Sequence, residues 1–404
     1  MNTKHPDNTI YIAGLGIISA IGNNLSDCLA SLKQYKDGIG TMQHLASVHQ
    51  DELPVAEVKL SNEQLADVCG LPSHISRTAL LSAVAAAEAL QDAGIDQIPG
   101  LRTGFISANT TGGMDKTEEF YESFVLNSAS GRLRKVVHHE CGSVTELVAE
   151  HLGITGYTST ISTACSSSAN AIMYGARLIR NNKLDVVVAG GTDALTRFTL
   201  NGFNTLMILD KEHCRPFDET RSGLNLGEGA GYVVLVSAKV ASALDKAMYC
   251  KFSGGSNAND AYHQTASSPD GTGSFLAMKG ALQQSGLQPA DISYINLHGT
   301  GTANNDASES TAIMRLFQAH FPKMSSTKSY TGHTLGASGG IEAVFSAISV
   351  QQNIVYSNLR LTTPIAGFPF SAETFYSDDT PVNHVLSNSF GFGGNCSSLV
   401  FSKL

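Results

Sequence analysis

The sequence predicts an α/β fold in which strands and helices alternate along most of the chain. Apolar residues make up 42% and charged residues 15% of the 404 residues, which is enough apolar material for a large core. Short apolar, β-branched runs alternate with longer segments of helical composition. Because helices of this length usually connect neighbouring parallel strands, we expect βαβ units.

The first half begins with a buried strand. Ile10–Ile18 is an apolar, β-branched run that contains Gly14 and Gly16. Thr78–Ala93 is rich in Ala and Leu and is followed by Gly94, a residue typical of the position after a helix. The remaining elements expected here are the strands Phe105–Ala108, Tyr157–Thr163, Leu184–Ala189 and Gly231–Val236 and the helix Ser166–Asn182.

In the second half, predicted strands and helices again alternate, after a weakly marked boundary. The run of apolar strands pauses near Ala238–Lys251, and the chain has no low-complexity segment or short-period repeat. The elements expected beyond the boundary are the helices Ser274–Ser285, Asp306–His320 and Ser338–Gln351 and the strands Ile292–Leu297 and Ser397–Phe401.

The charge and hydropathy patterns exclude several classes of partner. The net charge is −9 and no basic tract occurs, which argues against nucleic acid or an anionic membrane as the main partner. Apolar runs fall short of the ~18 residues that a membrane span needs. The segment Met1–Ile10 lacks the apolar stretch of a secretory signal.

The cysteine pattern indicates a reducing compartment. The count of seven is odd, the residues are scattered, and no CxxC spacing occurs, so a disulfide framework or a zinc ribbon is not expected. We therefore expect a cytoplasmic protein with no metal site. The cysteines are Cys28, Cys69, Cys141, Cys165, Cys214, Cys250 and Cys396.

The pair Gly14-x-Gly16 after the first strand has a weak likeness to a dinucleotide-binding fingerprint. The third glycine position is Ser19, and no acidic residue follows a second strand at the expected distance. The alternative interpretation, which we favour, is that these glycines allow another element to pack closely against the strand.

Cys165 stands where a nucleophile would be activated. The segment Thr163–Ser168 joins a predicted strand to a predicted helix, and the free N–H groups of a helix start favour a thiolate. The small neighbours Ala164 and Ser166 leave room for a substrate. The alternative is a buried structural cysteine, and local context alone does not separate the two.

Two histidines and a glycine-rich loop occupy similar positions. His298 ends a predicted strand, and His333 lies just before the predicted helix at Ser338; strand ends are where α/β folds build their sites. The segment Asn388–Gly394 holds two phenylalanines among glycines, with no lysine or helix start to make a phosphate cradle. It fits a tight turn that offers backbone N–H groups.

Taken together, these segments resemble an elongating β-ketoacyl-acyl carrier protein synthase, the condensing enzyme of type II fatty acid and polyketide synthesis. The resemblance covers nearly the whole chain. It implies the thiolase fold, with two similar α/β halves in a five-layered αβαβα arrangement. Residues 1–250 would form the half with the nucleophile, and residues 251–404 the half with both histidines. The edge strand near Tyr157–Thr163 would pair with its twin in a dimer.

The resemblance also implies catalytic roles. Cys165 matches the acyl-accepting nucleophile, and His298 and His333 match the two catalytic histidines. Lys328 and Glu342 match residues that support this site. The Phe392 N–H, with that of Cys165, would form the oxyanion hole, and the Phe392 ring would gate the acyl pocket.

Further residues would contact the substrate or its carrier. Thr300 and Thr302 match contacts to the phosphopantetheine arm, so the substrate would arrive on an acyl carrier protein and no cofactor would be bound. The other predicted substrate-binding residues are Thr111, Phe203, Glu309 and Phe390. The predicted carrier contacts are Arg132, Arg134 and Lys135.

Several departures from the family pattern bear on the substrate. Asn395-Cys396 replaces the usual Thr-Asn pair, Ala303 replaces a proline, and Thr111 replaces a bulky aliphatic residue. The segment Leu60–Gly70 carries acidic residues and no Lys or Arg, where many relatives place basic contacts to the acidic carrier. These changes fit a secondary pathway, such as polyene or polyketide synthesis, about as well as bulk fatty acid synthesis.

Two alternatives to a condensing enzyme stay open. A thiolase would use a second cysteine as its acid and base, and Cys396 is the late candidate. A non-catalytic subunit of the chain-length-factor type would have the fold without the nucleophile, and the presence of Cys165 with both histidines argues against it. Such a subunit is also a possible partner, so we expect a homodimer or such a heterodimer.

Overall fold

A computed structural model describes residues 8–95 and 100–404. The expectation that no secretory signal begins the chain concerns residues that lie mostly outside these ranges. Within them, no helix combines the length and the apolar character needed to cross a membrane.

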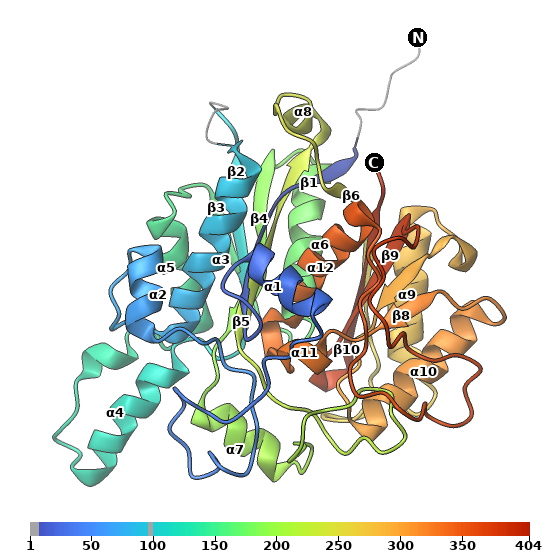
Figure 1. The fold of residues 1–404 in the computed structure, drawn as a ribbon. Helices are drawn as coiled ribbons and strands as arrows, with labels where there is room; N and C mark the ends of the chain where they lie inside the picture. The colour runs from blue at the N-terminus through green and yellow to red at the C-terminus, as the bar shows by residue number, and fades with distance from the viewer. Residues whose placement is uncertain (1–7, 96–99) are drawn as a thin grey trace.

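Ten strands of the described residues form one mixed sheet (Figure 1). Their order is β3-β2-β4-β5-β1-β6-β10-β9-β7-β8. The strands are β1 (Ile10–Ser19), β2 (Thr103–Ala108), β3 (Tyr157–Ile161), β4 (Val186–Asp193), β5 (Gly229–Ser237), β6 (Cys250–Asn259), β7 (Tyr294–Asn296), β8 (Lys323–Ser325), β9 (His384–Phe390) and β10 (Asn395–Ser402).

The strand order reveals two similar halves. From the β3 edge inward, strands follow one another as third, second, fourth, fifth and first of the N-terminal half, and from the β8 edge inward the C-terminal strands follow the same order. The halves join where β1 pairs with β6 through Ile10↔Phe252, Tyr11↔Lys251 and Ile12↔Cys250. The predicted division of the chain at residue 250 stays a prediction.

Helices form three layers around the two half-sheets (Figure 1). Helices α3 and α5 cover one outer face, α6 and α12 fill the middle, and α9 and α10 cover the other outer face. The helices are α1 (Leu25–Lys33), α2 (Asn62–Cys69), α3 (Arg77–Ala93), α4 (Met114–Leu126), α5 (Cys141–His151), α6 (Ser167–Arg180), α7 (Arg197–Thr205), α8 (Ala238–Ala241), α9 (Thr272–Ser285), α10 (Ala303–Phe317), α11 (Lys328–Thr331) and α12 (Ser338–Gln352). Short 3₁₀ turns include η2 (Leu133–Val136), η3 (Pro289–Asp291), η4 (Leu335–Ala337) and η5 (Phe392–Gly394). The five-layered arrangement is confirmed.

Helix α3 illustrates why the predicted helices form. The Ser76 side chain accepts a hydrogen bond from the Ala79 N–H at its start, and Gly94 adopts the left-handed conformation (φ 62°) at its end. The expected strands and helices are all present, with ends shifted by a few residues. The sequence analysis did not predict β6, β8 and β9, nor the helices α1, α2, α4, α5, α7, α8 and α11.

The prediction of parallel pairing is right only in part. Strand β2 runs parallel to β3 and β4, and β7 runs parallel to β8 and β9. Strand β5, however, is antiparallel to both β4 and β1. The register pairs Asp193 with Gly229, so the connection between β4 and β5 returns at the same end of the sheet instead of crossing it.

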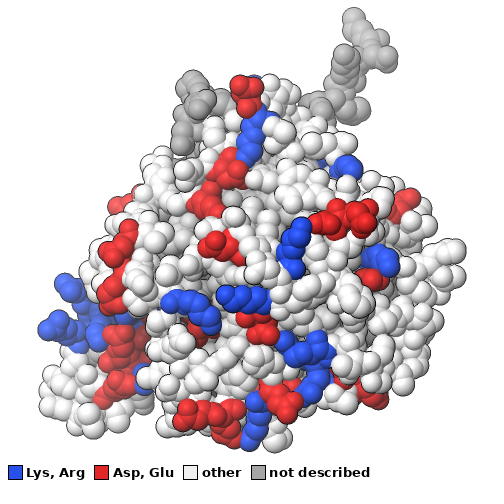
Figure 2. All heavy atoms as spheres, in the orientation of Figure 1, with Lys and Arg blue, Asp and Glu red and all other residues white. Residues whose placement is uncertain are grey.

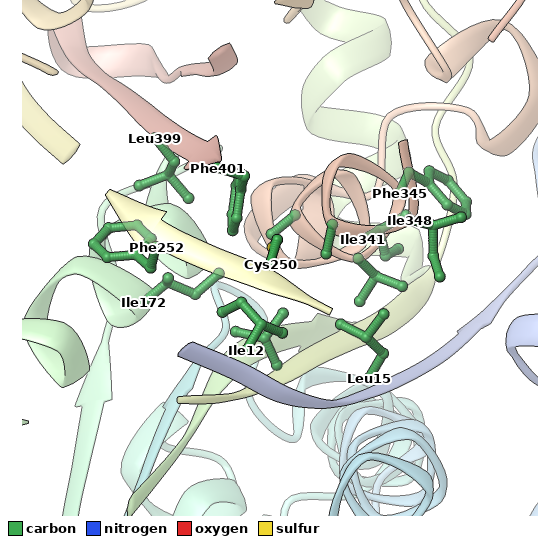
Figure 3. Packing of buried hydrophobic residues seen from close by; sticks show 14 of the residues in the cluster. Ile12, Leu15, Ile172, Cys250, Phe252, Ile341, Phe345, Ile348, Leu399 and Phe401 are labelled. Carbon is green, nitrogen blue, oxygen red and sulfur yellow. The ribbon is translucent and has the colours of Figure 1, made fainter. Parts of the chain in front are cut away.

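Gly14 and Gly16 serve close packing, which confirms the favoured interpretation. A Cβ at Gly14 would lie 2.2 Å from the Ala89 carbonyl oxygen, and one at Gly16 would lie 2.0 Å from that of Ala85. Helix α3 therefore rests directly on β1. On the other side of β1, apolar side chains gather between α12 and the β1–β6 junction (Figure 3), including Ile12, Leu15, Ile172, Cys250, Phe252, Ile341, Phe345, Ile348, Leu399 and Phe401.

Candidate active site

Cys165 lies in a tight turn between β3 and α6. The preceding Ala164 has a φ of 52°, a left-handed conformation that few residues other than glycine adopt. The Ser167 hydroxyl holds the turn, because it accepts from the Thr163 N–H at 2.8 Å and donates to the Ala164 carbonyl at 2.5 Å. The Cys165 residue is only 5% exposed. A strained, hydrogen-bonded turn thus fixes the sulfur at the start of a helix.

One imidazole lies beside this sulfur, and a second lies next to the first. The Nε2 atom of His333 is 3.1 Å from the Cys165 Sγ. The ring centre of His298 is 5.4 Å from that of His333, at an interplanar angle of 85°. His298 follows β7, and His333 follows α11. The fold therefore brings together three residues that are far apart in the sequence.

Both imidazoles are buried and neutral. Burial, assisted by the positive charge of Lys328, holds the pKa of His298 and of His333 well below the usual value of 6.5. A neutral imidazole has one ring N–H that donates and one ring nitrogen that accepts. The hydrogen-bond partner of Nδ1 in each ring therefore decides whether Nε2 is a donor or an acceptor.

Lys328 makes this choice for His298. Its Nζ lies 3.3 Å from the His298 Nδ1 and forms an ion pair with Glu342. Because an ammonium group only donates, Nδ1 accepts and the ring proton of His298 is on Nε2. Burial raises the pKa of Glu342 to about 7, and Lys328 opposes this rise.

Glu309 fixes the backbone of the loop that carries His298. Its carboxylate accepts hydrogen bonds from the backbone N–H groups of His298 and Gly299 at 2.9 Å, and from the Asn388 side chain at 3.0 Å. Burial raises the pKa of Glu309 to about 7. Glu309 is not among the residues that line the cavity described below, so its predicted contact with substrate stays a prediction.

The ionisation of Cys165 differs from the expectation of a favoured thiolate. Burial raises the pKa of the Cys165 thiol to about 11, while the Phe392 N–H and the charge of Lys328 act in the opposite direction. The physical reason is that removing a thiolate from water costs more than the partial charge of a helix start offsets. The resting site holds a thiol, and the negative charge develops during reaction.

The loop between β9 and β10 lies close to Cys165. A Cβ at Gly391 would lie 3.1 Å from the Cys165 backbone nitrogen, and the Phe392 N–H acts on the Cys165 sulfur. Gly393 and Gly394 have φ values of 78° and 76°, which the sharp turn requires. The N–H groups of Cys165 and Phe392 thus lie near the reacting sulfur. Their role as an oxyanion hole stays a prediction.

A cavity of about 390 Å³ opens onto these groups. The Phe392 ring stacks on that of Phe203 with centres 5.6 Å apart, and the Phe390 ring lies 5.8 Å from that of His298. An acyl chain entering this space would meet aromatic surface. The predicted site residues that line the cavity are Cys165, Phe203, His298, Thr300, Thr302, His333, Phe390 and Phe392.

Thr111 is turned toward a buried carboxylate. Its hydroxyl donates to Asp193 at 2.8 Å, and Asp193 also accepts from the Thr110 N–H at 2.9 Å and the Gly336 N–H at 2.7 Å. Thr111 does not line the cavity, so its predicted contact with the acyl chain stays a prediction. The sequence analysis missed Asp193, although it ends strand β4, a position that the same strand-end argument could have found.

The predicted carrier contacts Arg134 and Lys135 lie on η2, beside α4, and Arg132 directly precedes η2. Arg132 and Arg134 are exposed, and Lys135 donates to Glu119 at 2.8 Å. With Lys116 they line a surface hollow. Figure 2 shows Lys and Arg side chains gathered at the left edge of the molecule, in the region of α4, with acidic side chains next to them. Binding of a carrier there stays a prediction.

Among the described residues, no group of three or more His, Cys, Asp or Glu side chains is placed to hold a metal ion. A buried thiol in contact with one neutral imidazole, with a second imidazole lining the same cavity, is an arrangement suited to nucleophilic catalysis by sulfur.

Comparisons with known proteins agree with this class. Residues 7–241 match the family model "Beta-ketoacyl synthase, N-terminal domain", and residues 249–362 match "Beta-ketoacyl synthase, C-terminal domain". The 3-oxoacyl-[acyl-carrier-protein] synthase 2 of Staphylococcus aureus is 32% identical over 406 residues, covering 98% of each chain. The chain therefore belongs to the beta-ketoacyl synthase family, and it is a condensing enzyme of the acyltransferase type.

Solved structures give the same fold. A chain in the structure of the ketosynthase ApeO in complex with its chain length factor ApeC, from Xenorhabdus doucetiae, superposes with a TM-score of 0.83 at 30% identity, covering 99% of this chain and 100% of that one. The ishigamide ketosynthase/chain length factor has a TM-score of 0.92 at 24% identity, covering 98% and 99%. The thiolase fold implied by the sequence is confirmed.

Proposed function

We propose that this chain catalyses the decarboxylative condensation of an acyl group, held on Cys165, with a malonyl thioester. Both groups would be delivered on the phosphopantetheine arm of an acyl carrier protein. The observation that carries this proposal is the 3.1 Å approach of the His333 Nε2 to the Cys165 sulfur, in a cavity that His298 also lines.

In the first half-reaction, the Cys165 sulfur attacks the carbonyl carbon of the acyl thioester. A new carbon–sulfur bond forms to Cys165, the bond to the pantetheine sulfur breaks, and the thiol proton ends on the departing pantetheine. Negative charge gathers on the carbonyl oxygen in the transition state. The N–H groups of Cys165 and Phe392 would stabilise that charge.

In the second half-reaction, a malonyl thioester loses CO₂. The electron pair of the broken carbon–carbon bond forms an enolate, whose oxygen needs hydrogen-bond donors. The Nε2–H groups of His298 and His333 would supply them. The nucleophilic carbon then attacks the acyl-Cys165 carbonyl, a carbon–carbon bond forms and the carbon–sulfur bond to Cys165 breaks. The departing Cys165 thiolate takes a proton from solvent, which restores the resting thiol.

The approach to the cavity suits an extended polar arm. Thr300 and Thr302 line it, and their hydroxyl groups lie 2.9 Å apart at the start of α10. They would bind the amides of the phosphopantetheine arm. Arg132, Arg134 and Lys135 would contact the acidic carrier, so the enzyme would itself hold no cofactor.

The thiolase alternative is less favoured by the surroundings of Cys396. This residue lies on β10 and lines the cavity, but burial raises its pKa to about 12, and its sulfur lies 3.9 Å from the Ser274 hydroxyl. His298 and His333 already flank the nucleophile. A non-catalytic subunit would not keep Cys165 with both imidazoles.

We further propose a dimer in the cytoplasm, either of two identical chains or with a chain-length-factor-like subunit. Strand β3 is an edge of the sheet, and its first residue, Tyr157, is 39% exposed. An edge strand has unpaired N–H and carbonyl groups that a second strand can pair with. The related ketosynthase of Xenorhabdus doucetiae was solved with such a partner.

The test is to incubate the purified protein with a panel of acyl carriers and identify the acyl group on Cys165 by mass spectrometry. Malonyl carrier is then added, and CO₂ and the β-ketoacyl product are measured. The Cys165→Ala variant, which removes one sulfur without adding volume, should form neither the acyl-enzyme nor the product. Elongation by that variant would show that the nucleophile is assigned wrongly.

A further inference from the structure

His333 has a polar partner on the side of its ring that faces away from Cys165. Its Nδ1 lies 3.0 Å from the hydroxyl of Ser338, the first residue of α12. The Ser338 hydroxyl also lies 3.2 Å from that of Thr334. Ser338 and Thr334 are only 2% and 1% exposed. The ring therefore lies between a buried hydroxyl pair and the nucleophile.

Counting the available hydrogen-bond acceptors gives a direction to the two hydrogen bonds that link Thr334, Ser338 and His333. Among the described residues, the Thr334 hydroxyl forms one side-chain hydrogen bond, to Ser338. If Thr334 donates to Ser338, the Ser338 hydrogen is free to donate to the His333 Nδ1, and both hydroxyl hydrogens have an acceptor. In the reverse direction the Thr334 hydrogen would be buried without an acceptor, which is costly. The first arrangement is therefore the favoured one.

We propose that Ser338 is a positioning residue that keeps the proton of His333 on Nε2. His333 then presents an N–H donor to the Cys165 sulfur in the resting enzyme. The same N–H donates to the malonyl thioester oxygen in the condensation. This role in condensation rests on the proposed function. Ser338 thus does for His333 what Lys328 does for His298, with a neutral hydroxyl in place of an ammonium group.

The tautomer can be observed directly, without any activity. NMR of protein with isotope-labelled histidine nitrogens distinguishes a protonated Nε2 from a protonated Nδ1, and a His333→Gln variant identifies the signal of His333. We expect a single Nε2–H form in the wild type, a mixture in Ser338→Ala, and a return to the single form in Ser338→Thr. A wild-type His333 protonated on Nδ1, or an unchanged tautomer in Ser338→Ala, would overturn the proposal.

Kinetics supply the second readout. Loss of one buried hydrogen bond to the ring should slow CO₂ release from malonyl carrier roughly fivefold to tenfold. The KM for malonyl carrier should stay near its wild-type value, and Ser338→Thr should recover most of the rate. An equal loss of rate in Ser338→Thr would contradict the role of the hydroxyl.

A matched control separates positioning from general destabilisation. Ser346 is a fully buried serine of the same helix whose hydroxyl donates to the Glu342 carbonyl at 2.7 Å. Ser346→Ala should keep the wild-type tautomer and CO₂ release. If Ser338→Ala does not fold, Ser338→Cys, of nearly the same shape and a weaker donor, replaces it. Absence of CO₂ release in the wild type would refute the proposed function, whereas the NMR result judges this inference alone.

Discussion

Cys165 and His333 approach each other from corresponding positions of the two halves. The Nε2 of His333 lies 3.1 Å from the Cys165 Sγ, and each residue lies just before one of the two helices of the middle layer, α6 and α12. Because the strand order repeats in the two halves, these helix starts face one central point. The repeated strand order therefore places a nucleophile from one half next to an imidazole from the other half.

Replacing either histidine should affect decarboxylation more than loading of Cys165. Decarboxylation places charge on an oxygen facing the imidazoles, whereas acyl transfer places it near the N–H groups of Cys165 and Phe392. Loss of one donor at such an oxygen costs ~3 kcal/mol, roughly a hundredfold in rate. We expect slow residual loading but little CO₂ release in His298→Ala and His333→Ala, measured with radiolabelled acyl and malonyl groups. Near-normal CO₂ release with loading lost would reverse the assigned roles.

Charge reversal at Arg134 should weaken carrier binding. Arg134 is exposed, and the carrier is expected to be acidic, so Arg134→Glu should raise the apparent KM for carrier-bound substrate, and added salt should reduce the difference. A small pantetheine thioester should be affected much less. Lys183→Glu makes the same change of charge at an exposed position beyond the far end of α6, and should leave the KM unchanged. Equal effects on carrier and pantetheine substrates would exclude this surface.

Glu309 should make the stability of the protein depend on pH. Burial raises its pKa from 4.5 to about 7, so the folded protein holds a proton there that the unfolded chain releases. This contribution to stability is present below pH 4.5 and is lost as the pH rises through about 7. Glu309→Gln cannot titrate, so the stability of the wild type relative to this variant should fall across that window. Thermal unfolding at several pH values measures it, and a constant difference would show that Glu309 stays ionised.

A side chain at Gly16 should separate α3 from β1. A Cβ there would lie 2.0 Å from the Ala85 carbonyl oxygen, so Gly16→Ala forces the helix away from the strand. Overpacking of this kind typically costs ~1–3 kcal/mol of unfolding free energy. Gly40→Ala is the control, because a Cβ at Gly40 would meet no atom within 4 Å. Equal unfolding midpoints for the two variants in urea would show that the packing can relax.

Local patterns in the amino-acid sequence predicted the central strands and the long helices, and they singled out the reactive residues of the site. Apolar runs at strand length and a helix that ends at Gly94 depend on local preferences, which a short segment carries with it. Cys165, His298 and His333 were recognisable because each lies where a predicted strand or helix begins or ends. The family resemblance added the fold and the roles, since its motifs occur along nearly the whole chain.

Features that require distant segments to meet could not be predicted from local patterns. Strand β5 proved antiparallel to its neighbours, and the Thr111 hydroxyl proved to donate a hydrogen bond to Asp193. The pKa of Cys165 is set by burial, which no local pattern reveals. Ser338 becomes meaningful only because its hydroxyl lies 3.0 Å from the His333 Nδ1. Strand direction, burial and hydrogen-bond partners are properties of the packed chain, so the residues alone could not supply them.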